Sequence, residues 1–321
     1  MEAVINERKL RRKLWNEQGI MMLSYIVLQL GVMFVIGIAA MVKWYVQYGG
    51  KLSNQMIEQK LEQLIGNGVG PIIATLLGMG VILLYRRKQL FQYSLRVQRK
   101  KMDPKTFMLL LICFMSPQIL ISFTAFGAES ILNLFGYTIM EDLNYVVSGS
   151  NTISMMVYTV ILGPLAEEVL FRGVILRDNE KYGKGFAILF SAVLFGIFHG
   201  DLIQGFFAIL VGVILAYVTM EYSIKWAILM HIINNGIAEG LCLLEDVLSE
   251  NMHDIVYFSM FGSAFIFGLY TVIKNRKKIM RYINENGWEK GIWRKALSSI
   301  WLVIPILISV WMAFDGIKPM K

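Results

Sequence analysis

The sequence predicts an all-α fold, a polytopic transmembrane helix bundle of about eight to nine spans. Of the 321 residues, 56% are hydrophobic and only 17% are charged, whereas an ordinary soluble domain has about 25% charged residues. The apolar residues suffice for about nine stretches of ~20 residues, the length that crosses a bilayer. This composition excludes a soluble globular enzyme, a disordered chain and a fibrous repeat. Cys113 and Cys242 lie inside apolar runs, so they predict neither a disulfide framework nor a four-cysteine metal site.

Nine apolar stretches are long enough to cross, or nearly cross, a bilayer. They are residues 19–42, 68–85, 106–126, 151–171, 185–199, 202–220, 226–244, 253–273 and 296–314. The first follows a basic segment, as in a signal peptide, but its length predicts a retained helix. Within residues 43–67, the stretch QMIEQKLEQLIG has helical spacing and predicts a small surface helix. Only Gly200 and Asp201 separate the fifth and sixth stretches, which favours a tight turn or a partly re-entrant pair.

The basic residues predict the orientation of the chain. With a cytoplasmic N-terminus, 26 of the 31 Lys and Arg residues fall on the cytoplasmic side, in segments 1–18, 86–105, 172–184 and 274–295 and at Lys225. This positive-inside bias predicts a multi-pass protein of the plasma membrane with its N-terminus in the cytoplasm. The net charge of +8 is then a topology signal, and we expect no nucleic-acid partner. Aromatic residues in the basic segments leave attraction to anionic lipid as a second interpretation.

Ionisable residues inside apolar spans cost a few kcal/mol each, so their positions indicate a function or a partner. Glu167 and Glu168 are adjacent in the fourth stretch. Glu168 and Arg172 are four residues apart, share a helix face and can pair. Glu167 is rotated by about 100° and is expected to point elsewhere, without a local partner, where it would hold a proton, a water or a metal. Pro164 can loosen the helix one turn earlier. Alternatively, the two carboxylates mark the cytoplasmic end of this span.

Two of the three histidines belong to the same region. His199 ends the fifth stretch, and such a histidine is by itself typical of an interface or a satisfied core residue. His231 and Asn235 are one turn apart on the seventh stretch and share a face, with Asn234 offset. Buried His and Asn also join helices by hydrogen bonds. Together with Glu167, however, the two histidines are both metal-ligand types and general acid–base types.

Two further polar residues lie near these motifs. His253 begins the junction of an outer loop and the eighth stretch and is expected to have no role in the site. Glu239, one turn beyond Asn235, could line the same cavity, but it is expected to approach the outer surface. His231 is only six residues from Lys225. To reach the depth of the other polar residues, the seventh helix must begin before residue 226, or the preceding turn must be recessed.

These residues form three motifs: EEVLFR at 167–172, FGIFH at 195–199 and HIINN at 231–235. In this order, on successive apolar runs, they resemble the EExxxR, FxxxH and HxxxN motifs of the CPBP family of intramembrane proteases. That family includes the CAAX prenyl endopeptidases and bacterial abortive-infection-like proteins. The resemblance covers residues 160–245. The expected organisation is three N-terminal spans in 1–150, the motif-bearing catalytic core in 151–245 and C-terminal transmembrane helices in 246–321.

The resemblance implies an intramembrane endopeptidase that hydrolyses a peptide bond in a hydrophobic or membrane-anchored peptide or protein. It assigns the chemistry to four residues: Glu167, His199, His231 and Asn235. Glu167 and His199 would activate water, and His231 and Asn235 would stabilise the oxyanion or complete the site. Glu168 and Arg172 would be supporting residues. Two chemistries remain open, namely a zinc ion held by Glu167, His199 and His231, and metal-free glutamate catalysis.

The expected partners are a hydrophobic or lipid-anchored substrate and membrane lipid. Eukaryotic relatives imply a prenylated substrate, whereas bacterial relatives imply peptide processing or bacteriocin self-protection. A non-proteolytic membrane scaffold or regulator of the same fold is the main alternative, although a scaffold needs none of the four catalytic-type residues. A transporter is a third possibility, since intramembrane carboxylates and histidines also form proton relays. Transporters usually show internal repeats, and the sequence has none.

Overall fold

The computed structural model describes residues 2–49, 51–139, 152–245 and 247–320 and confirms the all-α prediction. The N-terminal part contains α1 (Glu2–Tyr48), α2 (Asn54–Ile65), α3 (Val69–Gln89), η1 (Leu90–Ser94), α4 (Pro104–Met115), α5 (Gln118–Asn133) and β1 (Tyr137–Thr138). The central part contains α7 (Ile153–Val157), η2 (Tyr158–Leu162), α8 (Gly163–Glu167), η3 (Glu168–Leu176), α9 (Arg177–Asn179), η4 (Glu180–Tyr182), α10 (Lys184–Phe198), α11 (Leu202–Glu221) and α12 (Ile224–Glu245). The last part contains α13 (Glu250–Glu285), α14 (Ile292–Ala296), α15 (Ile300–Asp315) and β2 (Lys318–Pro319), which pairs antiparallel with β1.

Within the described ranges, seven helical stretches are long and apolar enough to cross a membrane. They correspond to predicted stretches one to four and six to eight, and the chain is a multi-pass membrane protein. The fifth and ninth stretches form α10 and α15, with 15 and 16 residues. At 1.5 Å per residue they are about 22–24 Å long, shorter than the ~30 Å hydrocarbon core. The predicted surface helix is α2. Helix α12 begins at Ile224, before residue 226, which agrees with the expectation that the seventh helix begins earlier than its apolar stretch.

The third stretch is interrupted rather than continuous. Helix α4 ends at Met115 and α5 begins at Gln118, with Pro117 between them. Proline has no amide hydrogen and its ring clashes with the preceding turn, so the chain bends there. The bend places the buried side chain of Gln118 inside the bundle.

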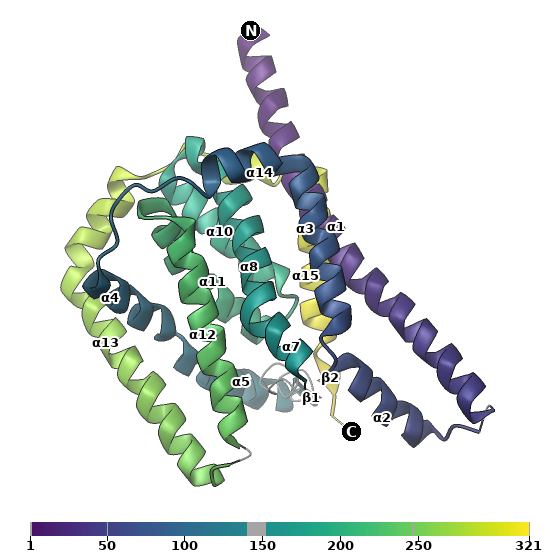
Figure 1. The fold of residues 1–321 in the computed structure, drawn as a ribbon. Coiled ribbons are helices and arrows are strands. Elements are labelled where there is room, and N and C mark those ends of the chain that lie inside the picture. Colours follow the sequence, from purple (N-terminus) through teal and green to yellow (C-terminus); the bar gives the residue numbers. More distant parts are fainter. Residues whose placement is uncertain (1, 50, 140–151, 246, 321) are drawn as a thin grey trace.

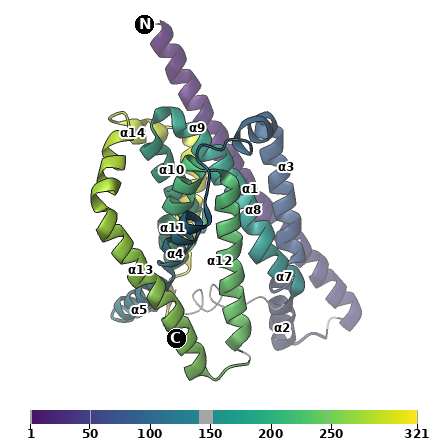
Figure 2. The ribbon, with the colours of Figure 1, turned by 60° about the vertical axis from the view of Figure 1, so that its left-hand side comes forward.

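Helices α10 and α11 form a close antiparallel hairpin in the middle of the bundle (Figure 2). The turn between them uses Gly200, whose φ of +64° is easily adopted only by glycine. Asp201 then caps α11 by accepting a hydrogen bond from the amide of Gln204. The two helices approach through Gly196 and Gly205, since a Cβ at Gly196 would lie 2.5 Å from the Gly205 carbonyl oxygen. The tight-turn interpretation of this junction is therefore correct.

We expect Gly196→Val to destabilise the protein by about 1–3 kcal/mol or more, because the added side chain meets backbone that cannot move aside. The measurement is the thermal midpoint of the purified protein in lipid nanodiscs. Gly240→Val is the matched control, because a Cβ at Gly240 meets no atom within 4 Å. Equal midpoints for the two variants would contradict the close approach of α10 and α11.

The helix that carries the two adjacent glutamates contains two π-helical segments, η2 and η3. In a π-helix each amide bonds five residues back, which widens the turn, and such segments are frequent at functional sites. Side chains of three other elements bond to carbonyls of this helix. These bonds are Asn235 Nδ2 to Thr159 O at 2.9 Å, Ser191 Oγ to Phe171 O at 2.8 Å and Ser94 Oγ to Gly173 O at 2.6 Å. The widened helix is thus fastened to its neighbours by polar contacts within an apolar bundle.

One end of the bundle collects the basic segments. The N-terminus and α14 lie at this end, and the C-terminus lies at the opposite end (Figure 1). Glu221, at the end of α11, accepts hydrogen bonds from Lys100, Lys184 and Tyr282, at 2.7, 2.8 and 2.9 Å. The bond to Glu221 raises the pKa of Lys100 above its ordinary value. This carboxylate therefore joins the segment before α4 to the ends of α10, α11 and α13.

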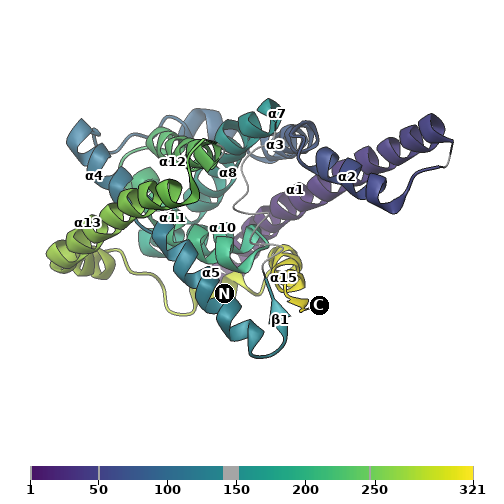
Figure 3. The same cartoon turned by 90° about the horizontal axis from the view of Figure 1, so that it is seen from below.

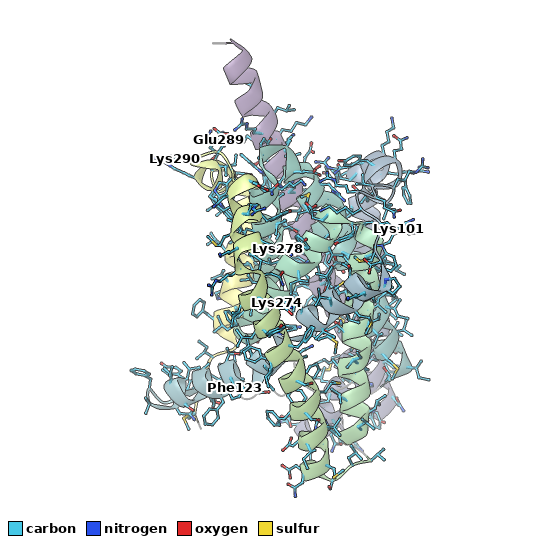
Figure 4. The ribbon with its side chains drawn as sticks, turned by 90° about the vertical axis from the view of Figure 1, so that its left-hand side faces the viewer. Lys101, Phe123, Lys274, Lys278, Glu289 and Lys290 are labelled. Atoms are coloured by element: carbon cyan, nitrogen blue, oxygen red, sulfur yellow. The ribbon has the colours of Figure 1, made fainter. Side chains whose placement is uncertain are left out.

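Parts of three helices, α1, α2 and α13, lie at the periphery of the bundle. Helix α2 and the second half of α1 project together to one side when the molecule is seen from below (Figure 3). On the other side, α13 carries exposed cationic side chains near its C-terminal end, among them Lys274 and Lys278 (Figure 4). Helices α1 and α13 contribute residues to the cavity described below, whereas no residue of α2 lines it.

Candidate active site

The polar centre begins with the ion pair that the sequence predicts. Arg172 Nη1 lies 2.9 Å from Glu168 Oε1, and both side chains are completely buried. The four-residue spacing spans one turn even though η3 is widened. The Arg172 guanidinium also lies over the ring of Phe195, 4.2 Å from its centroid, and its Nη2 donates to the Gly212 carbonyl at 3.3 Å. The predicted pairing of Glu168 with Arg172 is confirmed.

His231 lies between the two adjacent carboxylates. Its Nδ1 is 3.1 Å from Glu168 Oε1, and its Nε2 is 3.7 Å from Glu167 Oε2. An ionised carboxylate can only accept, so Nδ1 of His231 donates its proton to Glu168. In the neutral ring, Nε2 is then the free acceptor on the side of Glu167. Glu168 therefore fixes both the tautomer and the orientation of the imidazole.

Glu167 was expected to point elsewhere than Glu168, without a local partner, and the structure gives it a partner from another helix, His231 of α12. Both carboxylates face the same imidazole, from its two nitrogens. The two carboxylates do not share a helix face; the imidazole lies between them and bridges the angular step between adjacent helical residues with its two nitrogens. Glu167 keeps about a quarter of its side-chain surface exposed, and Glu168 keeps none. The accessible carboxylate is Glu167, and the buried one is Glu168.

His199 joins this centre through Phe195. The Phe195 ring makes edge contacts with His199 and His231, at centroid distances of 4.7 and 5.9 Å. Nδ1 of His199 is 2.7 Å from the Phe195 carbonyl oxygen. Because a carbonyl can only accept, this nitrogen carries a proton, and Nε2 is left for the cavity. In the sequence, Phe195 is notable only as the first residue of the FxxxH motif. In the structure its ring contacts the rings of both histidines.

Asn235 and Asn234 both reach the centre, although only Asn235 was expected to. Asn235 Nδ2 donates to the Thr159 carbonyl at 2.9 Å, and Asn234 Nδ2 donates to Asn235 Oδ1 at 3.2 Å. Gln118 Nε2 in turn donates to Asn234 Oδ1 at 3.1 Å. A chain of amides thus runs from α5 through α12 to η2. Gln118 was missed in the sequence, where the pair Pro117–Gln118 inside an apolar run is the signal that could have found it.

We expect Gln118→Leu to destabilise the protein by about 1–3 kcal/mol, because Asn234 Oδ1 loses its donor in a buried site. The thermal midpoint in nanodiscs measures this effect. Gln55→Leu, on the exposed surface of α2, controls for the change in hydrophobicity. A Gln118→Leu midpoint equal to that of the control would show that the amide chain contributes nothing to stability.

The four predicted catalytic residues line one cavity of about 940 Å³: Glu167, His199, His231 and Asn235. The cavity lies between α1, α5, α8, α10, α11, α12 and α13. Glu168 and Arg172 do not line it, so their supporting position behind Glu167 and His231 agrees with the structure. His253 also lines the cavity, contrary to the expectation that it lies outside the site, and Glu239 lines it too, which is the second of the two alternatives for this residue. His253 Nε2 lies 3.6 Å from Glu245 Oε1 near the α12–α13 connection.

The proposed zinc ligands do not gather into a ligand cluster. Within the described parts of the chain, no three His, Cys, Asp or Glu side chains are close enough together to hold one metal ion. Glu167 and His231 are close, but Nδ1 of His231 is occupied by Glu168, and Nδ1 of His199 is bonded to its own helix. The geometry does not fit a three-residue zinc site. Cys113 and Cys242 are free thiols.

Residues 149–237 match the family of type II CAAX prenyl endopeptidase Rce1-like proteins. The matched segment contains all three motifs and ends just after HIINN. This segment belongs to the CPBP family. No curated protein and no solved structure matches the chain.

The CPBP segment does not build the cavity alone. It supplies the wall from η2 to the middle of α12, whereas Tyr25 of α1, Gln118 of α5 and His253 of α13 lie outside it. The match supports the resemblance of this segment to a family of membrane proteases, and the long apolar helices make the chain a multi-pass membrane protein. The helices before and after the segment complete the chamber around its motif residues.

Proposed function

We propose that the protein is an intramembrane endopeptidase that hydrolyses a peptide bond in a hydrophobic or membrane-anchored peptide. The observation that carries this proposal is the pair formed by Glu167 and His231, 3.7 Å apart on the wall of a large cavity. A carboxylate next to an imidazole of fixed tautomer is suited to take and pass on protons. The apolar helices around it keep bulk water away, which strengthens each electrostatic contact in the site.

In the proposed reaction, Glu167 accepts a proton from a water molecule whose oxygen attacks the scissile carbonyl carbon. The electron pair of the carbonyl π bond moves to its oxygen and forms a tetrahedral oxyanion. When the intermediate collapses, the C–N bond breaks and Glu167 returns the proton to the leaving nitrogen. His231 stabilises the charge that Glu167 gains and loses, because its other nitrogen is held by the buried Glu168. His199 offers Nε2 to the cavity and assists in orienting the water.

Asn235 is the proposed donor for the oxyanion. His231, whose Nε2 accepts in the neutral ring, would donate to the oxyanion only in its protonated form. Its Nδ2 is held by the Thr159 carbonyl, and one amide N–H remains for the substrate because an amide nitrogen carries two hydrogens. A zinc ion held by Glu167, His199 and His231 stays the alternative chemistry. It would require these side chains to move together from the arrangement described above.

The proposed setting is the plasma membrane, with the N-terminus in the cytoplasm. The bundle end with the N-terminus, Lys100 and Lys184 would face the cytoplasm, in agreement with the positive-inside rule. The partners would be a hydrophobic or lipid-anchored peptide or protein and the surrounding membrane lipid. Peptide processing or bacteriocin self-protection in a bacterium is the biological role that we propose for this reaction.

The test is peptide cleavage by the purified protein in liposomes, with wild type beside Glu167→Ala. The panel contains a prenylated C-terminal peptide and unprenylated hydrophobic leader peptides, each with and without a metal chelator. We expect cleavage that is lost in Glu167→Ala and kept in Glu58→Ala, a change on the exposed face of α2. Loss of activity with chelator would favour the zinc chemistry. Equal cleavage by wild type and Glu167→Ala would contradict the proposal and favour a non-proteolytic scaffold or regulator.

A further inference from the structure

Asn235, the proposed oxyanion donor, has both ends of its side-chain amide bonded. Its Nδ2 donates to the Thr159 carbonyl oxygen at 2.9 Å, and its Oδ1 accepts from Asn234 Nδ2 at 3.2 Å. A carbonyl oxygen can only accept, so the nitrogen must lie on the side of Thr159 and the oxygen on the side of Asn234. An amide turned by 180° would bring two oxygens together at Thr159, and it would place an oxygen where the oxyanion needs an N–H.

The same requirement extends through Asn234 to Gln118. Because Asn235 Oδ1 needs a donor, Asn234 must present its Nδ2 there, and Asn234 Oδ1 then faces α5. Gln118 Nε2 donates to this oxygen at 3.1 Å. Gln118 is 7% exposed and Asn234 is 4% exposed, so water does not readily replace these partners. The three amides therefore donate in one direction, toward the Thr159 carbonyl, and each disfavours the reversed orientation of the next.

Gln118 is itself held in place by α13. It is the first residue of α5, directly after Pro117. Tyr257 Oη of α13 donates to the main-chain carbonyl of Gln118 at 3.3 Å, and it lies 3.3 Å from Ser122 Oγ, one turn further along α5. The start of α5 is thus bonded to α13 beside the amide chain. Gln118 and Tyr257 both lie outside the CPBP segment.

We infer that Gln118 and Asn234 are positioning residues for Asn235, and that they hold its amide in the orientation that leaves an N–H for the oxyanion. This inference rests on the proposed function, in which Asn235 donates to the oxyanion. Gln118 and Asn234 act through Asn235 and do not touch the reacting atoms. Because the negative charge develops only in the transition state, loss of this orientation lowers kcat rather than raising KM.

The first test measures Gln118→Leu with the peptide that shows the largest Glu167-dependent cleavage in the liposome panel, well below the thermal midpoint of the variant. We expect kcat to fall by between about 10-fold and the ~10²-fold that a misplacement of about 1 Å can cost, with KM unchanged. Wild-type kcat, or a raised KM with unchanged kcat, would overturn the positioning role.

Gln18→Leu is the matched control for stability. Gln18 is also a fully buried glutamine, but its Nε2 donates to Asp178 at 3.2 Å and its Oε1 accepts from Asn179 at 3.1 Å, outside the cavity lining. We expect this variant to have a lower thermal midpoint in nanodiscs and wild-type kcat. A fall in its kcat as large as that of Gln118→Leu would show that activity follows stability, and would overturn the inference.

The second test is Gln118→Leu in the background of Asn235→Ala. Asn235→Ala alone is expected to lower kcat by about 10²- to 10³-fold, the effect of removing one oxyanion donor. No amide is then left to orient, so the double variant should have the kcat of Asn235→Ala, although its thermal midpoint falls further. Two falls in kcat that multiply in the double variant would show that Gln118 acts through another group, and would overturn the inference.

Asn234→Ala breaks the chain in its middle and leaves α5 unchanged, so it decides the question if Gln118→Leu does not fold. We expect kcat to fall with KM unchanged, and Asn234→Ala/Asn235→Ala to have the kcat of Asn235→Ala. Wild-type kcat in Asn234→Ala, or falls that multiply in this double variant, would overturn the inference.

Two results separate this inference from the proposed function. An inactive Glu167→Ala beside wild-type kcat in Gln118→Leu and Asn234→Ala would overturn the positioning role and leave the endopeptidase intact. Equal cleavage by wild type and Glu167→Ala would overturn both the proposed function and the positioning role.

Discussion

Glu167→Gln is expected to lower kcat for peptide cleavage by about 10²- to 10⁴-fold, the usual contribution of a positioned general base. The amide keeps the size of the side chain but cannot accept the proton of water. The variant should fold as well as wild type, because Glu167 is partly exposed to the cavity and the like charge of Glu168 lies on the next residue. Steady-state cleavage in liposomes and the thermal midpoint in nanodiscs measure the two effects separately.

The matched comparison is Glu168→Gln. That change removes the acceptor for His231 Nδ1 and the partner of the buried Arg172, so it should lower both stability and activity. The two variants would then differ: Glu167→Gln would lose activity but keep its stability, whereas Glu168→Gln would lose both. If Glu167→Gln kept more than about a third of wild-type kcat, Glu167 would not be the base.

Arg172→Met is expected to destabilise the protein by about 3–5 kcal/mol, because it leaves the fully buried Glu168 without its cationic partner. The loss also removes the contact of the guanidinium with Phe195 and the bond to the Gly212 carbonyl. The free energy of unfolding in mixed micelles, measured by denaturant titration, gives the size of the effect.

The double variant Glu168→Gln/Arg172→Met provides the control. It also removes the buried carboxylate charge of Glu168, which the single variant leaves without a cationic partner. Replacing both members of a buried pair is often neutral, and we expect the double variant to regain most of the lost stability. A double variant as unstable as Arg172→Met would show that the guanidinium acts through its other contacts rather than through Glu168.

Much of the fold follows from hydropathy. All nine apolar stretches are helical over most of their described residues, the third in two pieces, and the spacing of Glu168 and Arg172 correctly indicates their ion pair. The shared cavity of the motif residues follows from their order on successive helices. Hydropathy does not show which helices are too short to cross the bilayer. Helices α10 and α15 are apolar like the longer helices, but the turns at their ends limit their length to 15 and 16 residues.

The fine geometry of the site could not be derived from periodicity. Glu167 and Glu168 both contact His231 because the ring of this residue from α12 lies between them, and spacing along one helix does not show a contact between helices. The contribution of α1 depends on long-range packing, although the one-turn spacing of Tyr25 and Gln29 is a polar stripe that the sequence displays. His253 is far from the three motifs along the chain, so the sequence does not predict that it lies on the cavity wall.

The bonds that fasten the π-helical span have a consequence for biogenesis. Membrane helices enter the bilayer in the order of their synthesis, and each ionisable residue in a lone helix costs about 2.5–3.5 kcal/mol to insert. This span carries two glutamates and an arginine, and its carbonyl bonds to Ser191 and Asn235 come from helices made later. His231, the partner of both glutamates, is also made later. The span is therefore least stable when it first leaves the ribosome, and it reaches its native shape only when α10 and α12 have joined it.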